Sequence, residues 1–160
     1  MEGNSTLEEF GKNLGCFRFV VLEHELPPES GRTSHWDLLL EQPPVWGGML
    51  LSFEVSNPPA EWGPPTAVLK LPDHRPLYLS YEGPISGNRG SVRRVLDGQI
   101  RWQEKTEELL SLNFQLARNS LSSNADLVPK GLLRIRKNLE EANHNQWEME
   151  WMPADKQMGG

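Results

Sequence analysis

Clusters of proline and glycine divide this chain into short apolar segments, and the short length of these segments limits what the chain can fold into. Examples are Pro27-Pro28, Pro43-Pro44, Pro58-Pro59 and Gly83-Pro84. Proline lacks a backbone N–H and interrupts both helices and central strands, so each cluster marks a turn or a loop. Short apolar segments separated in this way predict many short strands joined by loops.

The segments between the clusters carry the residue types and the alternation of β-strands. In residues 146–152, Trp147, Met149 and Trp151 share one parity, which is the period of a strand with one buried face. Asp97-Gly98 lies between two such segments and predicts a tight hairpin. Strands are expected at residues 17–25, 35–41, 48–55, 67–71, 77–81, 91–96, 99–103, 109–116, 132–137 and 146–152.

Helix signals are few. Ser5 and Glu8 form a capping box that predicts a short helix over residues 5–13, and Thr106–Leu109 is a second candidate. We therefore expect a mainly β fold, a small antiparallel β-barrel with one or two short peripheral helices, because closing a sheet removes its unpaired edges. Residues 15–153 are expected to form one domain, between a frayed segment at residues 1–14 and a flexible tail at residues 154–160.

Composition narrows the functional classes. The 160-residue length suits one domain, and the net charge of −6 argues against a protein that coats nucleic acid unselectively. The single cysteine, Cys16, rules out an intrachain disulfide and favours the reducing cytoplasm. No apolar stretch approaches the roughly 20 residues of a spanning helix, and residues 1–12 lack the pattern of a secretory signal, so no membrane partner is expected.

His35 and Asp37 are the strongest candidate for a chemical site. Strand residues two apart face the same side at about 6.6 Å, so both side chains can converge on one cation. His24, near the end of the preceding strand, supplies a third ligand if the two strands are neighbours. Two imidazoles and one carboxylate suit Mn²⁺, Zn²⁺ or Fe²⁺ better than Ca²⁺. Taken alone, a His-x-Asp pair is more often only a surface hydrogen bond.

Five motifs, taken together and in order, resemble the 3′-phosphoesterase domain of bacterial DNA ligase D. The similarity covers about residues 17–152, nearly the whole chain. The motifs are FVVLEH at 19–24, HWDLLLE at 35–41, DHRPLY at 73–78, YEGPI at 81–85 and GNRGSV at 87–92. The resemblance implies a small β-barrel enzyme that binds a divalent metal, most often Mn²⁺ with Zn²⁺ as the other possibility. Such domains trim 3′ ends of DNA or DNA–RNA strands during end repair, removing a 3′-phosphate or a terminal 3′-ribonucleoside.

The resemblance also assigns roles by position. The implied metal ligands are His24, His35 and Asp37, and the implied catalytic residues are His35, Asp37 and His74. The implied phosphate-binding residues are His74, Tyr78 beside it, and Arg32 as a partial replacement for the absent family arginine. The chain carries no ligase or polymerase motif, so a ligase or polymerase partner would act in trans.

Two further candidates come from the residues themselves. Arg89 belongs to a local basic run and is a candidate for binding phosphate. Glu82 either orients a ligand histidine or caps a turn.

Two alternatives remain open at this stage. Leu39 stands where the family carries an arginine on the ligand face, which favours a non-catalytic module that binds DNA ends or a partner protein. His35, Asp37 and the later His74 also mimic the facial triad of a non-haem iron oxygenase.

Overall fold

The protein is an antiparallel β-barrel in the computed structural model, which describes residues 15–63, 65–117, 130–140 and 145–153. The strands are β1 (Phe17–Glu25), β2 (His35–Leu40), β3 (Leu50–Val55), β4 (Thr66–His74), β5 (Gly83–Pro84), β6 (Ser91–Lys105), β7 (Leu109–Leu116), β8 (Lys130–Lys137) and β9 (Gln146–Pro153). The predicted mainly β fold is confirmed.

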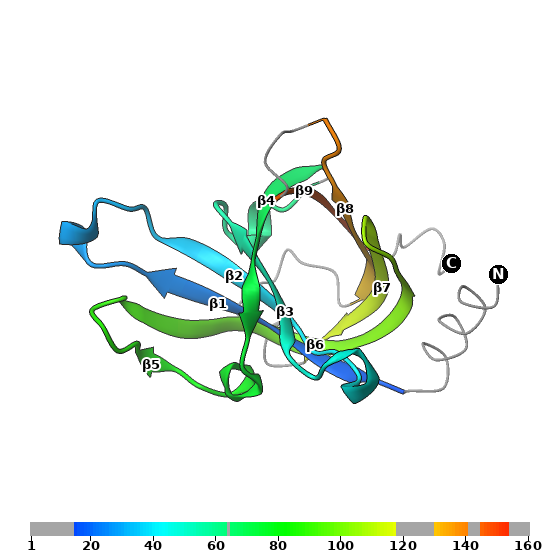
Figure 1. The fold of residues 1–160 in the computed structure, drawn as a ribbon, viewed down its shortest axis with the longest axis horizontal. Coiled ribbons are helices and arrows are strands. Elements are labelled where there is room, and N and C mark those ends of the chain that lie inside the picture. The colour runs from blue at the N-terminus through cyan, green and yellow to red at the C-terminus, as the bar shows by residue number, and fades with distance from the viewer. Residues whose placement is uncertain (1–14, 64, 118–129, 141–144, 154–160) are drawn as a thin grey trace.

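Closure of the barrel depends on the first strand. Eight strands follow one another in the order β1-β2-β3-β4-β9-β8-β7-β6, and β6 pairs again with β1 (Figure 1). The two-residue β5 lies outside this ring and pairs only with the beginning of β6. Every neighbouring pair is antiparallel. Because a β-strand is pleated, its successive side chains point alternately to the interior and to the outer wall.

Helical structure in the described ranges is limited to four 3-10 turns, each with a proline in its first positions. They are η1 (Pro28–Ser30), η2 (Pro44–Trp46), η3 (Pro59–Glu61) and η4 (Pro76–Leu79). The strand expected at 77–81 is therefore wrong, because Pro76 begins a 3-10 turn there. No helix within these ranges has the length and apolar character needed to cross a bilayer.

The helix expected at Thr106–Leu109 is also wrong. The Thr106 hydroxyl oxygen accepts hydrogen bonds from the backbone N–H groups of Glu108 and Leu109, which forms the turn between β6 and β7. Thr106 thus offers the backbone a local alternative to a helix. The helix expected over residues 5–13 lies outside the described residues.

Asp97-Gly98 is not a hairpin. It lies inside the continuous strand β6, which pairs with β1 on one side and β7 on the other. A Cβ at Gly98 would lie 2.1 Å from the Gln115 carbonyl oxygen and 2.8 Å from the Phe19 ring. The glycine is therefore required for close approach of neighbouring chains, not for a turn.

Two apolar clusters lie on opposite faces of the barrel wall. The larger cluster draws side chains from all eight barrel strands and therefore fills the interior. Its members include Phe19, Val21, Leu38, Phe53, Val68, Ile100, Leu112, Leu133, Met149 and Trp151. The smaller, outer cluster consists of Val20, Leu22, Leu39, Leu50, Leu79 and Val92, with Tyr78, Tyr81 and Ile85 packed against it. The segment from η4 to β5 thus covers one outer patch of β1, β2 and β6.

Replacing Gly98 with alanine tests the close approach of β6 to its neighbours. Because the Cβ would meet a backbone oxygen that cannot move without disturbing the β6–β7 ladder, we expect a loss of about 1–3 kcal/mol in the free energy of unfolding. Urea denaturation measures it. Gly63→Ala is the control, since its Cβ meets nothing within 4 Å. Equal stability of the two variants would contradict the close approach.

Candidate metal centre

The antiparallel register of β1 and β2 brings the three predicted ligands together. His24 is paired with His35, and Leu22 is paired with Asp37. All three polar side chains share the face of Leu22 and Leu39, so they stand on the outer wall beside the outer apolar cluster. This confirms the predicted alternation, in which His35 and Asp37 face away from the interior while Leu38 points into it.

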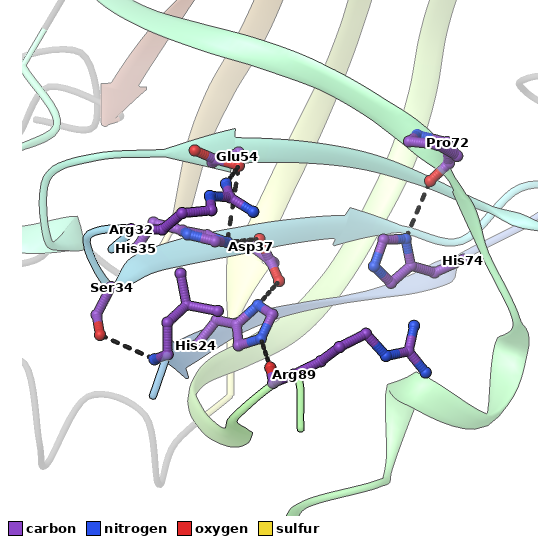
Figure 2. A network of polar contacts seen from close by, with 10 residues as sticks. His24, Arg32, Ser34, His35, Asp37, Glu54, Pro72, His74 and Arg89 are labelled. Atoms are coloured by element: carbon purple, nitrogen blue, oxygen red, sulfur yellow. Dashed lines mark hydrogen bonds and ion pairs between the residues drawn. The ribbon is translucent and has the colours of Figure 1, made fainter. Parts of the chain in front are cut away.

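Asp37 lies between the two imidazoles. Its Oδ2 is 3.2 Å from His24 Nδ1, and its Oδ1 is 3.0 Å from His35 Nε2 (Figure 2). One ligand atom from each of the three residues lies within 4.8 Å of the others. Two imidazole nitrogens and a carboxylate oxygen at this separation match the donor set of a divalent transition-metal site.

Two buried polar atoms show that this group of residues fits a cation. Asp37 Oδ1 and His35 Nδ1 have no hydrogen-bond partner within the described part of the chain, and both residues are buried. The 3.0 Å contact between Asp37 Oδ1 and His35 Nε2 is close but does not have hydrogen-bond geometry. A buried carboxylate oxygen without a partner is costly, and a bound cation would remove that cost. These residues therefore fit a metal ion.

Both ring nitrogens of His24 face hydrogen-bond acceptors. Nδ1 faces Asp37, and Nε2 donates to the backbone carbonyl of Arg89 at 2.9 Å. This arrangement favours the doubly protonated ring, and the hydrogen bond to Asp37 raises the pKa of His24 above its usual range. A histidine ligand commonly donates its second N–H to a backbone carbonyl, so the Arg89 carbonyl is suited to orient His24 toward a metal.

Burial by itself would raise the pKa of Asp37. Contacts from His24 and His35 outweigh burial and hold the pKa of this carboxyl below its ordinary value. Asp37 is therefore a carboxylate at neutral pH, which is the form that binds cations.

Gly90 allows the loop after β5 to reach His24. Its φ is +86°, and a Cβ there would lie 1.9 Å from the Glu25 carbonyl oxygen. Only glycine fits against the end of β1 in this way. The close contact positions the neighbouring Arg89 carbonyl on the imidazole of His24.

A cavity of about 360 Å³ opens beside the three ligands. It is lined by Leu22, His24, Asp37, Pro72, Asp73, His74, Arg75, Tyr78, Ile85, Arg89 and Val92. His74 Nδ1 donates to the Pro72 carbonyl at 3.0 Å, which leaves Nε2 without a partner among the residues described (Figure 2). Tyr78 packs edge-on against the His74 ring at 5.6 Å. The structure thus gathers His74, Tyr78 and Arg89 around the same space as His24 and Asp37.

Two predicted site residues do not line this cavity. Arg32 does not line the cavity, and its guanidinium lies 3.4 Å from the Glu54 carboxylate. Glu82 does not touch a ligand histidine in the structure, and its carboxylate accepts a hydrogen bond from the Arg94 backbone N–H at 2.7 Å. Leu39 is fully buried in the outer apolar cluster.

Sequence reasoning missed Glu54 and Arg75. Glu54 is paired with Asp37 across β2 and β3, and its carboxylate lies 3.8 Å from His35 Nε2. The parity of β3 predicts that Glu54 points away from Phe53, but only the register with β2 places it at the site. Arg75, the residue that follows His74 in the chain, also lines the cavity.

No protein-family model matches this chain, and no curated protein matches it. The arrangement offers a donor set of two imidazoles and one carboxylate, next to a cavity lined by Asp73, His74, Arg75 and Arg89. Such a combination can bind a divalent cation and an anion side by side.

Titration of the His24–Asp37 pair predicts how the stability of the metal-free protein depends on pH. Because the pKa of His24 is raised above 6.5, the stability it adds is fully present below pH 6.5 and is lost as the pH rises through the raised value. Because the pKa of Asp37 is lowered below 3.8, its contribution is present above pH 3.8 and is lost as the pH falls through the lowered value. The pair therefore stabilises most between these two limits.

Urea unfolding of chelator-treated protein measures this effect. The difference in free energy of unfolding between the native chain and His24→Gln should be largest between pH 3.8 and pH 6.5 and should shrink on either side. If the difference in the free energy of unfolding stays constant across the pH range, the His24–Asp37 interaction does not contribute to stability in this way.

Proposed function

We propose that this protein is a metal-dependent 3′-end-processing phosphoesterase that acts on DNA or DNA–RNA 3′ termini in end repair. One observation carries the proposal: the convergence of His24, His35 and Asp37 beside a cavity that also holds His74 and Arg89. A phosphoester needs both a Lewis acid and cationic hydrogen-bond donors as charge develops on its oxygens. The resemblance to the phosphoesterase domain of DNA ligase D points to the same residues.

The ion would be held by His24, His35 and Asp37, and Mn²⁺ is the first choice, with Zn²⁺ second. When bound, it supplies Lewis-acid polarisation of a phosphoryl oxygen. His74 Nε2 is the group of the chain that donates to or accepts from the phosphate, because its Nδ1 is already held by the Pro72 carbonyl. Tyr78 holds the His74 ring edge-on, and Arg89 brings a positive charge to the same cavity.

The substrate is a 3′-phosphate or a terminal 3′-ribonucleoside. With a net charge of −6, the chain has little affinity for long duplexes, so recognition is concentrated at the terminus. A ligase or polymerase supplied in trans would use the trimmed end. The cytoplasm, where such ends are repaired in bacteria, also suits the single exposed thiol, Cys16.

A second candidate is a non-catalytic module that binds DNA ends or a partner protein on the same barrel. Leu39 favours it, because this position on the ligand face is apolar and fully buried, so β2 offers no cation there to a developing phosphate charge. Loss of one such donor typically lowers the rate of a catalytic site by about 10²–10³.

Metal titration tests the centre. We expect calorimetry to detect Mn²⁺ or Zn²⁺ binding to the native chain and none to His35→Ala or Asp37→Ala, since each loses a donor. His74→Ala is the matched control and should retain binding, because His74 is outside the donor set. On addition of Zn²⁺, the NMR signals of His24, His35 and Asp37 should shift together. If they do not, the three residues do not form a metal site.

Turnover tests the enzyme. With Mn²⁺ present, the native chain should release phosphate from a 3′-phosphorylated primer–template, and His74→Ala should be slower by about 10²–10³ through loss of a donor to the phosphate. Arg136→Gln, on β8 and ion-paired with Glu150, is the control for loss of a distant positive charge. If the chain binds the 3′-phosphorylated end without releasing phosphate, the enzyme hypothesis is wrong and the non-catalytic binding module is supported.

A further inference from the structure

Glu54 is a second carboxylate at the metal centre. It stands on β3 directly across from Asp37, and its side chain is only 16% exposed. Its Oε1 lies 3.8 Å from His35 Nε2, and Asp37 Oδ1 lies 3.0 Å from the same nitrogen. His35 Nε2 is therefore flanked by oxygens from two carboxylates on two strands.

Two carboxylates directly opposite one another on neighbouring strands repel each other. Water screens this repulsion little here, because Asp37 is buried and the Glu54 side chain is only 16% exposed. A cation between the two carboxylates would relieve it. His24 contacts Asp37 at 3.2 Å, whereas no described contact joins His24 to Glu54.

Arg32 forms only a weak ion pair with Glu54. The two groups are 3.4 Å apart, and the Arg32 side chain is 61% exposed (Figure 2). Exposed pairs of this kind contribute little to stability, because water screens them and a long side chain must be held still. Arg32 can therefore leave Glu54 at small cost when a stronger cation arrives.

We propose that Glu54 is a fourth protein ligand of the metal centre, an oxygen donor that exchanges Arg32 for the divalent ion. The proposal rests on the metal-dependent function above and extends its donor set to two imidazoles and two carboxylates. With neutral imidazoles, two carboxylates balance the charge of one divalent ion. The added oxygen favours Mn²⁺, which takes oxygen ligands, over Zn²⁺, for which three protein ligands and a water are enough.

Glu54→Gln is the direct test, since it keeps the shape of the side chain and removes its charge. Electron paramagnetic resonance of free Mn²⁺ measures binding without any substrate. We expect Glu54→Gln to bind Mn²⁺ at least about tenfold more weakly, because loss of even an outer partner of a metal ligand costs about 10–100-fold. The loss of Zn²⁺ affinity should be smaller. A thermal melt of each variant checks that the barrel is intact.

Glu23→Gln is the matched control. Glu23 is next to His24 in β1 and pairs with Arg93 in the way that Glu54 pairs with Arg32, but no described ion pair or hydrogen bond joins it to His24, His35 or Asp37. Its removal takes the same charge from the same region without taking a donor, so Mn²⁺ binding should change little. Equal weakening by Glu23→Gln and Glu54→Gln would overturn the proposal in favour of a general charge effect.

Arg32→Gln separates competition from simple repulsion. If Arg32 competes with the ion for Glu54, its removal should strengthen Mn²⁺ binding in the native chain and not in Glu54→Gln. Equal strengthening in both backgrounds would overturn the exchange. Native protein that binds no divalent ion would overturn the proposed function together with this inference, whereas native binding that Glu54→Gln retains in full would overturn this inference alone.

Discussion

The pairing of β1 with β2 in one register is the constraint on which the rest of the structure depends. Side chains alternate across a strand, so a slip of one residue would send His35 and Asp37 into the interior and Leu38 to the outer wall. The buried interior cluster forbids that slip, because it would expose apolar area and bury charge. Packing inside the barrel thereby fixes the positions of His24, His35 and Asp37 on the outer wall.

β6 adds the second half of this constraint by pairing with the other edge of β1. Its pairing closes the barrel and also brings the loop before β6 against the end of β1, where Gly90 contacts the Glu25 carbonyl. The Arg89 carbonyl then reaches His24, and Arg89 joins the cavity. β6 thus links closure of the barrel to the orientation of the His24 side chain.

Much of the fold and part of the site could be predicted from local pattern. Strand parity places His35 and Asp37 on one face, and His24 joins them because β1 and β2 are neighbours, the condition that the sequence left open. The barrel follows from many short strands that need closed edges. Asp97-Gly98 was misread because the same dipeptide serves a tight turn or a close approach, and only the neighbours Phe19 and Gln115 decide which. Glu54 was missed because cross-strand partners depend on register, which no single segment encodes.

The place of the positive side chains makes the proposed anionic substrate compatible with an acidic chain. Leu39 and the outer apolar cluster form the wall beside the predicted ligands, so β2 brings no cation to the cavity. His74 ends β4, whereas Arg75 and Arg89 lie between strands, before η4 and before β6. Positive charge delivered by loops is more readily repositioned than charge on a strand, because loops have fewer packing constraints. Under the proposed function, whether the chain is an enzyme or an end-binding module would depend on how firmly these loops hold a phosphate beside His24, His35 and Asp37.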